Sequence, residues 1–196
     1  MYKTTLNTIT RHYIEYIHEC IQYKSFRNYE MIKEICGCEI AGKNVDFYLN
    51  YTKDSTLKAG YSISALYYQT EYKVEIILKI AKDFGSSYLT DLYLNLKAYL
   101  IHEVEHHLQN CKVPFREFLP PENYKSNLEY ITAPSELEAF TKALYYIHRK
   151  TKKPFKYILM QESEAISTDK RNQLIFRQGI YNFIRRRKDL NIIQNI

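Results

Sequence analysis

The spacing of apolar residues changes within the chain, and this change constrains the fold more than any other feature of the sequence. From Val45 to Thr52 apolar and polar residues alternate, as in a half-buried strand. Two further strand-like runs follow at Gly60–Gln69 and Tyr72–Ile80, so we expect a three-stranded antiparallel meander. A largely apolar helix is expected after Gly85, running to about Asn110 and buried on most sides. Its N-cap is expected at Ser86, Ser87 or Thr90.

Helical patterns flank this core on both sides. Apolar residues at spacings of three and four predict an N-terminal helix through Ile9, Tyr13 and Ile17, and a second short helix is expected at Tyr29–Ile35. Residues 111–133 contain three prolines and predict a long ordered loop, a kind of segment that is often functional. Later helices are expected at Pro134–Arg149, Pro154–Ile166 and Thr168–Lys188.

The predicted fold class is therefore α+β, mainly helical, with a small three-stranded antiparallel sheet packed on the long helix. A length of 196 residues fits one domain. Within it we expect N-terminal helices at 1–40, a core at 44–150 and a C-terminal helical extension at 151–196.

The long helix carries the sequence HEVEH, from His102 to His106. Residues four apart stack on one helix face, so His102 and His106 can bind one ion. Zinc accepts imidazole nitrogens, and a catalytic zinc keeps three protein ligands and a water. Glu103 lies on the neighbouring flank, where its carboxylate can take the proton of that water. A buried helix bearing two histidines and a glutamate is costly without a partner for them, which favours one Zn²⁺ per chain.

The third ligand is expected on the helix that begins near Pro134, where Glu136 and Glu138 are the candidates. Two residues apart on a helix they point to nearly opposite sides, so only one can reach the metal. Ser135 and Glu138 have the form of a capping box, which gives Glu138 a structural role. Glu136 lies on the apolar stripe, where a carboxylate is stable only beside a cation. We therefore assign Glu136 as the ligand and keep Glu138 as the alternative.

With these residues the chain resembles the gluzincin class of zinc metallopeptidases, the thermolysin-like group, and within it the small, compact members. The resemblance covers about residues 44–149 and includes Glu136-Leu137-Glu138-Ala139, which is similar to the E-x-x-A pattern of the class. It implies a zincin-like core, hydrolysis of a protein or peptide substrate with Glu103 as the base, and binding of the substrate backbone by an edge strand between Gly60 and Ile80.

The chain departs from the class at Phe140, where many members have an acidic residue that orients a metal-binding histidine. The class also uses a donor to the transition state, for which Tyr145, Tyr146 and His148 are candidates here. His107 points about 100° away from His106 and is interpreted as a residue behind the ligands or facing solvent.

Two alternative functions remain. The same scaffold can serve as a non-catalytic or latent metal-binding module for protein recognition, which the Phe140 departure favours. A nucleic-acid-associated regulator is the other alternative, motivated by the net charge of +6 and by Arg185–Arg187, although cations are also favoured at the end of a solvated helix.

Composition also leads us to expect a cellular compartment and a type of source genome. No signal peptide or membrane-spanning run is found, so we expect a cytoplasmic protein with four reduced cysteines and no membrane partner. Twenty tyrosines beside many Lys, Ile and Asn residues are typical of an AT-rich genome, such as that of a virus or phage.

Overall fold

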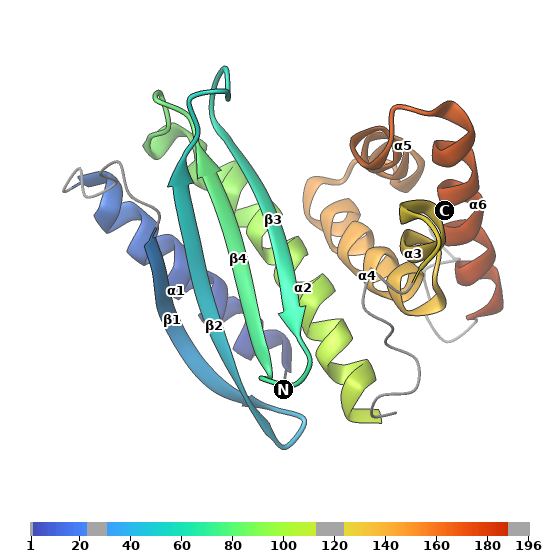
Figure 1. Cartoon of the computed structure of the whole chain (residues 1–196), viewed down its shortest axis with the longest axis horizontal. Coiled ribbons are helices and arrows are strands. Elements are labelled where there is room, and N and C mark those ends of the chain that lie inside the picture. The colour runs from blue at the N-terminus through green and yellow to red at the C-terminus, as the bar shows by residue number, and fades with distance from the viewer. Residues whose placement is uncertain (1, 23–30, 113–123, 188–196) are drawn as a thin grey trace. The chain divides into compact units, whose positions relative to one another are not determined.

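The computed structural model describes residues 2–22, 31–112 and 124–187 (Figure 1). Its helices and strands are α1 (Tyr2–Gln22), β1 (Met31–Ile40), β2 (Lys43–Lys53), β3 (Tyr61–Tyr68), β4 (Lys73–Ile80), the 3-10 helix η1 (Ser86–Tyr88), α2 (Leu89–Lys112), α3 (Asn127–Ile131), α4 (Pro134–Thr151), α5 (Phe155–Ile166) and α6 (Lys170–Arg186). They form two compact units, residues 1–108 and 109–196, and the division falls inside α2. The predicted division after residue 150 lies inside the second unit.

The first unit contains a four-stranded mixed sheet in the order β1-β2-β4-β3. The chain is α+β as expected, but the expected three-stranded antiparallel meander is wrong. β4 pairs with β3 in antiparallel fashion and lies parallel to β2, so it separates two strands that are consecutive in sequence. β4 takes the central place because Val74, Ile76, Leu78 and Ile80 are all buried.

The connection from β2 to β3 crosses the end of β4 and is held there by backbone hydrogen bonds. The amide of Asp54 donates to the carbonyl of Ile80, and the amide of Ala81 donates to the carbonyl of Gly60. Gly60 has a φ of +72°, and a Cβ at this position would lie 3.0 Å from the ring of Tyr88. Only glycine fits this position without strain.

The N-terminal segment 1–40 is not wholly helical, because Met31–Ile40 is strand β1 where a short helix was expected at Tyr29–Ile35. β1 and β2 form a hairpin closed by Ala41 and Gly42, whose φ angles are 53° and 76°. Two consecutive positive φ angles are typical of the type I′ turn, whose twist matches that of the two strands. Pairing with β2 across this turn therefore outweighs the helical spacing.

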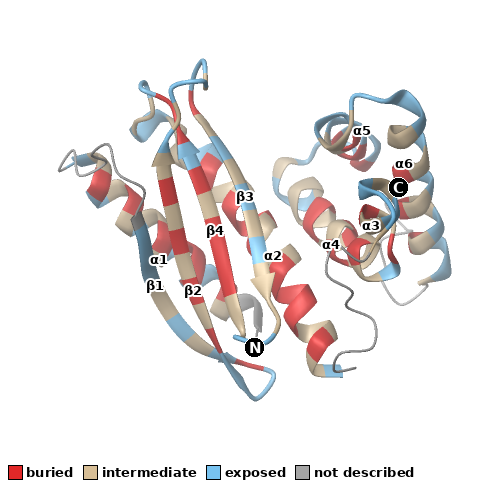
Figure 2. Cartoon of the chain, viewed as in Figure 1, coloured by how far each residue is buried: buried red, intermediate tan, exposed pale blue. Residues whose placement is uncertain are grey.

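Both α1 and α2 lie on one face of the sheet, and Figure 2 shows buried residues along the sides of these helices that face it. One continuous core joins the sheet to these two helices. It contains, among others, Leu6, Ile9, Tyr13 and Ile17 of α1, Phe47 and Leu49 of β2, Leu78 of β4, and Leu92, Leu96, Leu100 and Val104 of α2.

The second unit is helical and has its own core. α3 to α6 pack around Leu144, Phe155, Leu159, Phe176 and Ile180. α4 and α6 come close at Gly179, where a Cβ would lie 3.1 Å from Cδ2 of Leu137. The expected helices at Pro134, Pro154 and Thr168 are present as α4, α5 and α6 with small shifts in their bounds. The expected loop at 111–133 differs, because α2 continues to Lys112 and α3 forms at Asn127–Ile131, while 113–123 lie outside the described residues.

Candidate metal centre

The two histidines of the HEVEH segment face each other on α2. Nε2 of His102 and Nε2 of His106 are 3.0 Å apart, and the ring centroids are 4.7 Å apart with the rings nearly perpendicular. His106 is buried and His102 half-buried. Without an ion, this distance is that of a hydrogen bond in which one ring carries the proton.

The same distance fits two ligands of one zinc ion. At a Zn–N distance of 2.0–2.1 Å, two ligands of a tetrahedral ion are about 3.3 Å apart. The nitrogens at 3.0 Å therefore need to separate by only a few tenths of an ångström. The side chains of His102, His106 and Glu136 each offer one ligand atom, and these atoms all lie within 4.8 Å of one another. Two imidazoles and one carboxylate form a donor set typical of catalytic zinc.

Glu136 lies in the first turn of α4 and is 4 % exposed. Free backbone N–H groups at the start of a helix favour a negative charge there. The burial expected for Glu136 is present, and its place in the first turn of α4 is one that favours an acidic residue.

Gln109 connects the end of α2 to the start of α4. It follows His106 by three residues, and its side-chain amide donates to the carbonyl of Ser135 at 3.1 Å and lies 3.4 Å from Oε2 of Glu138. Ser135 directly precedes Glu136, so within the second unit this contact joins the last turn of α2 to the first turn of α4.

Glu138 is occupied by other partners. Its Oε1 lies 3.2 Å from Nζ of Lys142 and 3.6 Å from Nη2 of Arg187, at the end of α6. The expected capping box is wrong, because α4 begins at Pro134 with Ala133 as its N-cap and no side chain caps it. Glu138 still has a structural role, as the partner of two cations, and this favours Glu136 as the ligand.

Glu103 is 6 % exposed, next to His102 on α2. As the next residue of the helix, it is 100° around the axis from His102. A second carboxylate of the same segment, Glu105, is 1 % exposed. Buried carboxylates at this density are unusual outside functional sites.

The three candidate donors to the transition state lie far along α4 from Glu136. At 1.5 Å per residue, Tyr145 and Tyr146 are about 13–15 Å and His148 about 18 Å along the axis. Nδ1 of His148 lies 2.7 Å from the carbonyl oxygen of Lys153, and its ring packs edge-on against Phe155. Nη1 of Arg149 lies 3.5 Å from the hydroxyl of Tyr145. The structure does not bring these three residues together with Glu136.

Tyr124 is a residue near Glu136 that the sequence pattern did not single out. Its ring packs against Tyr130 with centroids 5.4 Å apart. Burial, together with the carboxylates of Glu136 and Glu129, raises the pKa of Tyr124, so its phenol stays protonated and can donate a hydrogen bond. Residues 111–133 have no periodic apolar pattern that could mark Tyr124 as a site residue. The only sequence signal for it is its place in this long proline-containing segment.

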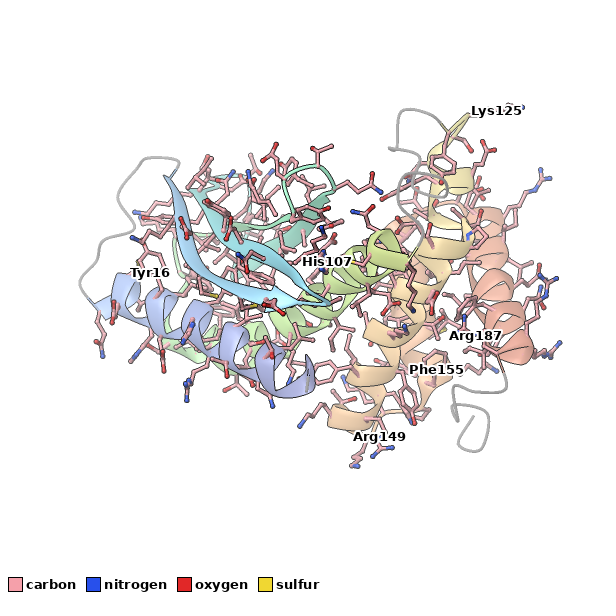
Figure 3. The ribbon with its side chains drawn as sticks, turned by 90° about the horizontal axis from the view of Figure 1, so that it is seen from below. Tyr16, His107, Lys125, Arg149, Phe155 and Arg187 are labelled. Carbon is pink, nitrogen blue, oxygen red and sulfur yellow. The ribbon has the colours of Figure 1, made fainter. Side chains whose placement is uncertain are left out.

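His107 is fully buried, which excludes the solvent-facing alternative. Its Nε2 is 2.9 Å from the carbonyl oxygen of Ile40, and its Nδ1 is 3.0 Å from the hydroxyl of Tyr67. The Ile40 carbonyl can only accept, so Nε2 carries the proton and Nδ1 accepts from Tyr67. Figure 3 labels His107 on α2, from which its side chain reaches the strands.

Phe140 belongs to the core of the second unit. Its ring packs edge-on against Phe176 with centroids 5.2 Å apart. An aromatic residue at this position contributes packing and offers no acceptor to a metal-binding histidine.

The four cysteines are free. Burial raises the pKa of Cys36 to about 11, so this thiol is not a nucleophile at neutral pH.

Comparisons with protein-family models, with curated proteins and with solved structures give no match to this chain. No helix in the described part of the chain combines the length and the apolar character needed to cross a membrane.

Proposed function

We propose that the protein is a zinc-dependent peptidase in which His102, His106 and Glu136 hold one Zn²⁺. The observation that carries the proposal is the convergence of their three ligand atoms within 4.8 Å. The burial of Glu136 and its separation from the ion pairs of Glu138 support it further.

Held by His102, His106 and Glu136, a zinc ion would supply Lewis acidity for the attack of water on a carbonyl group. Glu103 takes the proton of the attacking water and passes it to the leaving amine. Low exposure of Glu103 excludes bulk water from that transfer.

The edge strand β3 is proposed to bind the backbone of an extended substrate. It is the outer strand next to β4 and pairs on one side only. Two contacts hold it along α2: Tyr61 donates to Asp91 at 2.6 Å, and Tyr67 contacts His107. An extended peptide added to β3 would therefore run beside the helix that carries His102 and His106.

A non-catalytic metal-binding module is the second candidate function. The packing of Phe140 against Phe176 favours it, because no carboxylate at this position orients a ligand. Loss of a hydrogen-bond partner that orients a metal-binding side chain typically lowers metal affinity or activity 10–100-fold.

The test is cleavage of an unfolded protein by zinc-loaded wild type and by Glu103→Gln, with metal content measured on both. Glu164→Gln, which removes an exposed carboxylate on α5, is the control. A peptidase is expected to lose most of its activity with Glu103→Gln while zinc and the control activity remain. Zinc binding without cleavage by the wild type would favour the second candidate, and cleavage surviving Glu103→Gln would remove the assigned base.

A further inference from the structure

The positive charge of the chain is concentrated in its second unit. Residues 109–196 contain 16 Lys and Arg against nine Asp and Glu, whereas residues 1–108 contain 12 against 13. The whole net charge of +6 therefore comes from the helical unit.

Within that unit, five cations are gathered where α4 ends and α5 begins. We call this cluster the basic turn: Arg149, Lys150, Lys152, Lys153 and Lys156. All five are exposed, and the sequence contains no acidic residue between Glu138 and Glu162. Among the described residues, none of the five forms an ion pair with a carboxylate. Five unpaired cations within eight residues make a concentrated positive surface.

The basic turn has a defined backbone. The amide of Lys152 donates to the carbonyl of His148, the side chain of His148 bonds to Lys153, and the hydroxyl of Thr151 donates to Ile147. Phe155 is buried beneath the turn, while Figure 3 shows Arg149 pointing away from the ribbon. These contacts present the cations from a fixed scaffold, so less conformational entropy is lost when they bind an anion.

Lys152 has a left-handed backbone, with a φ of 60°, at the C-cap of α4. Glycine adopts this conformation at lower cost and is the usual residue there. Position 152 thus has a charged lysine where the backbone conformation alone favours glycine.

An exposed aromatic ring lies among these cations. Tyr157 is 42 % exposed, and Nζ of Lys153 lies over its ring, 5.8 Å from the ring centroid. Cations interleaved with exposed aromatic rings are typical of surfaces that bind single-stranded nucleic acid, where phosphates meet the cations and bases stack on the rings.

The apolar side of α5 argues against a lipid surface. Phe155, Ile158 and Leu159 are buried in the core of the second unit, and the large apolar residues that α5 leaves exposed are Tyr157 and Met160, a narrower face than a helix needs to insert between lipids. We propose that the basic turn binds single-stranded nucleic acid, with little dependence on base sequence. This site is distinct from the candidate metal centre, because Glu136 and Arg149 are separated by about 20 Å along α4.

The Arg185–Arg187 cluster is the weaker candidate for such a surface. Arg187 pairs with Glu138, and its guanidinium lies 5.8 Å from the ring centroid of Phe183. Arg185 and Arg186 are exposed and provide a matched control, since they carry two charges of the same unit at another place.

The test is fluorescence anisotropy of a labelled single-stranded oligonucleotide of about 16 nucleotides, titrated with the full chain at several salt concentrations. Five phosphate contacts predict a slope of about −3.5 in a plot of log affinity against log salt, which is a loss of about 100-fold between 50 and 200 mM. Lys153→Gln/Lys156→Gln is expected to reduce the slope by about 1.4, and Arg185→Gln/Arg186→Gln to leave it unchanged.

Lys152→Gly separates binding from folding. It is expected to reduce the slope by about 0.7 without lowering the melting temperature, because glycine suits the left-handed position. No saturable binding at the lowest salt, or an equal loss with the arginine control, would overturn the proposal. Binding to anionic phospholipid vesicles without binding to the oligonucleotide would overturn it as well.

Discussion

The hydroxyl of Tyr67 on β3 lies 3.0 Å from Nδ1 of His107 on α2. His107 directly follows His106, a proposed metal ligand, so this hydrogen bond joins the edge strand to the turn of α2 that carries the two proposed histidine ligands. The other ring nitrogen of His107 is held by the carbonyl of Ile40, at the end of the β1–β2 hairpin. One buried side chain therefore joins α2 to two separate parts of the sheet.

Tyr67→Phe is expected to destabilise the first unit. It leaves Nδ1 of a fully buried His107 without its donor, which costs about 1–3 kcal/mol of unfolding free energy. Tyr93→Phe is the control, since the structure gives Tyr93 no hydrogen-bond partner among the described residues. Urea denaturation measures both variants, and equal stability of Tyr67→Phe and the control would contradict this role of Tyr67.

The imidazole of His107 is expected to titrate below its ordinary range. Burial lowers its pKa from 6.5, so the folded protein binds this proton less well than the unfolded chain does. Its contribution to stability is complete above pH 6.5 and is lost as the pH falls toward the lowered pKa of the folded state. NMR titration of the imidazole resonances measures this directly, and a His107 pKa at or above 6.5 would contradict it.

Phe176→Ala is expected to lower the free energy of unfolding of the helical second unit. Phe176 is fully buried and packs against Phe140, so the truncation costs about 3–5 kcal/mol through lost contacts and a cavity. Leu174→Ala on the same helix is the control, because Leu174 is 48 % exposed. Thermal denaturation compares the two, and similar midpoints would show that the Phe140–Phe176 contact contributes little.

Lys152→Gly is expected to leave the free energy of unfolding unchanged or to raise it by up to about 1 kcal/mol. The reason is the left-handed conformation of Lys152, with a φ of 60°. Lys150→Gly is the control, since Lys150 is a helical residue in the last turn of α4, where glycine relieves no left-handed strain and lowers stability. A loss of stability with Lys152→Gly as large as with Lys150→Gly would contradict the C-cap assignment.

Local patterns in the sequence predict the helices and the paired histidines because both depend on residues close together in the chain. The four-residue spacing of His102 and His106 fixes their common face once the helix is recognised. The burial of Glu136 also follows from its place on the apolar stripe of α4.

Structural features that depend on residues far apart in the chain cannot be predicted from local spacing. The central place of β4 depends on its pairing with both β2 and β3, which no local spacing encodes. The apolar spacing of β1 is compatible with a helix as well as with a strand, and the turn at Ala41–Gly42 that joins it to β2 lacks the usual Asn-Gly pair. The predicted capping box is absent because α4 begins at Pro134, which makes Ser135 a helical residue and not the N-cap.

The remaining site predictions depend on tertiary contacts. Ser135-x-x-Glu138 fits a local motif, yet Glu138 is instead paired with Arg187, the residue after α6, 49 positions later in the chain. Tyr124 comes near Glu136 through the fold of a segment without a periodic pattern. Neither relationship leaves a trace in residue spacing.

The central claim is tested most directly by elemental analysis of zinc in untagged protein, for the wild type and for His106→Ala, Glu136→Ala and Glu138→Ala. The account predicts about one zinc per chain in the wild type and in Glu138→Ala, and loss of zinc from the other two variants. A wild type that holds no zinc and takes up none when zinc is added would contradict the metal centre. Loss of zinc with Glu138→Ala but not with Glu136→Ala would contradict the choice of the third ligand.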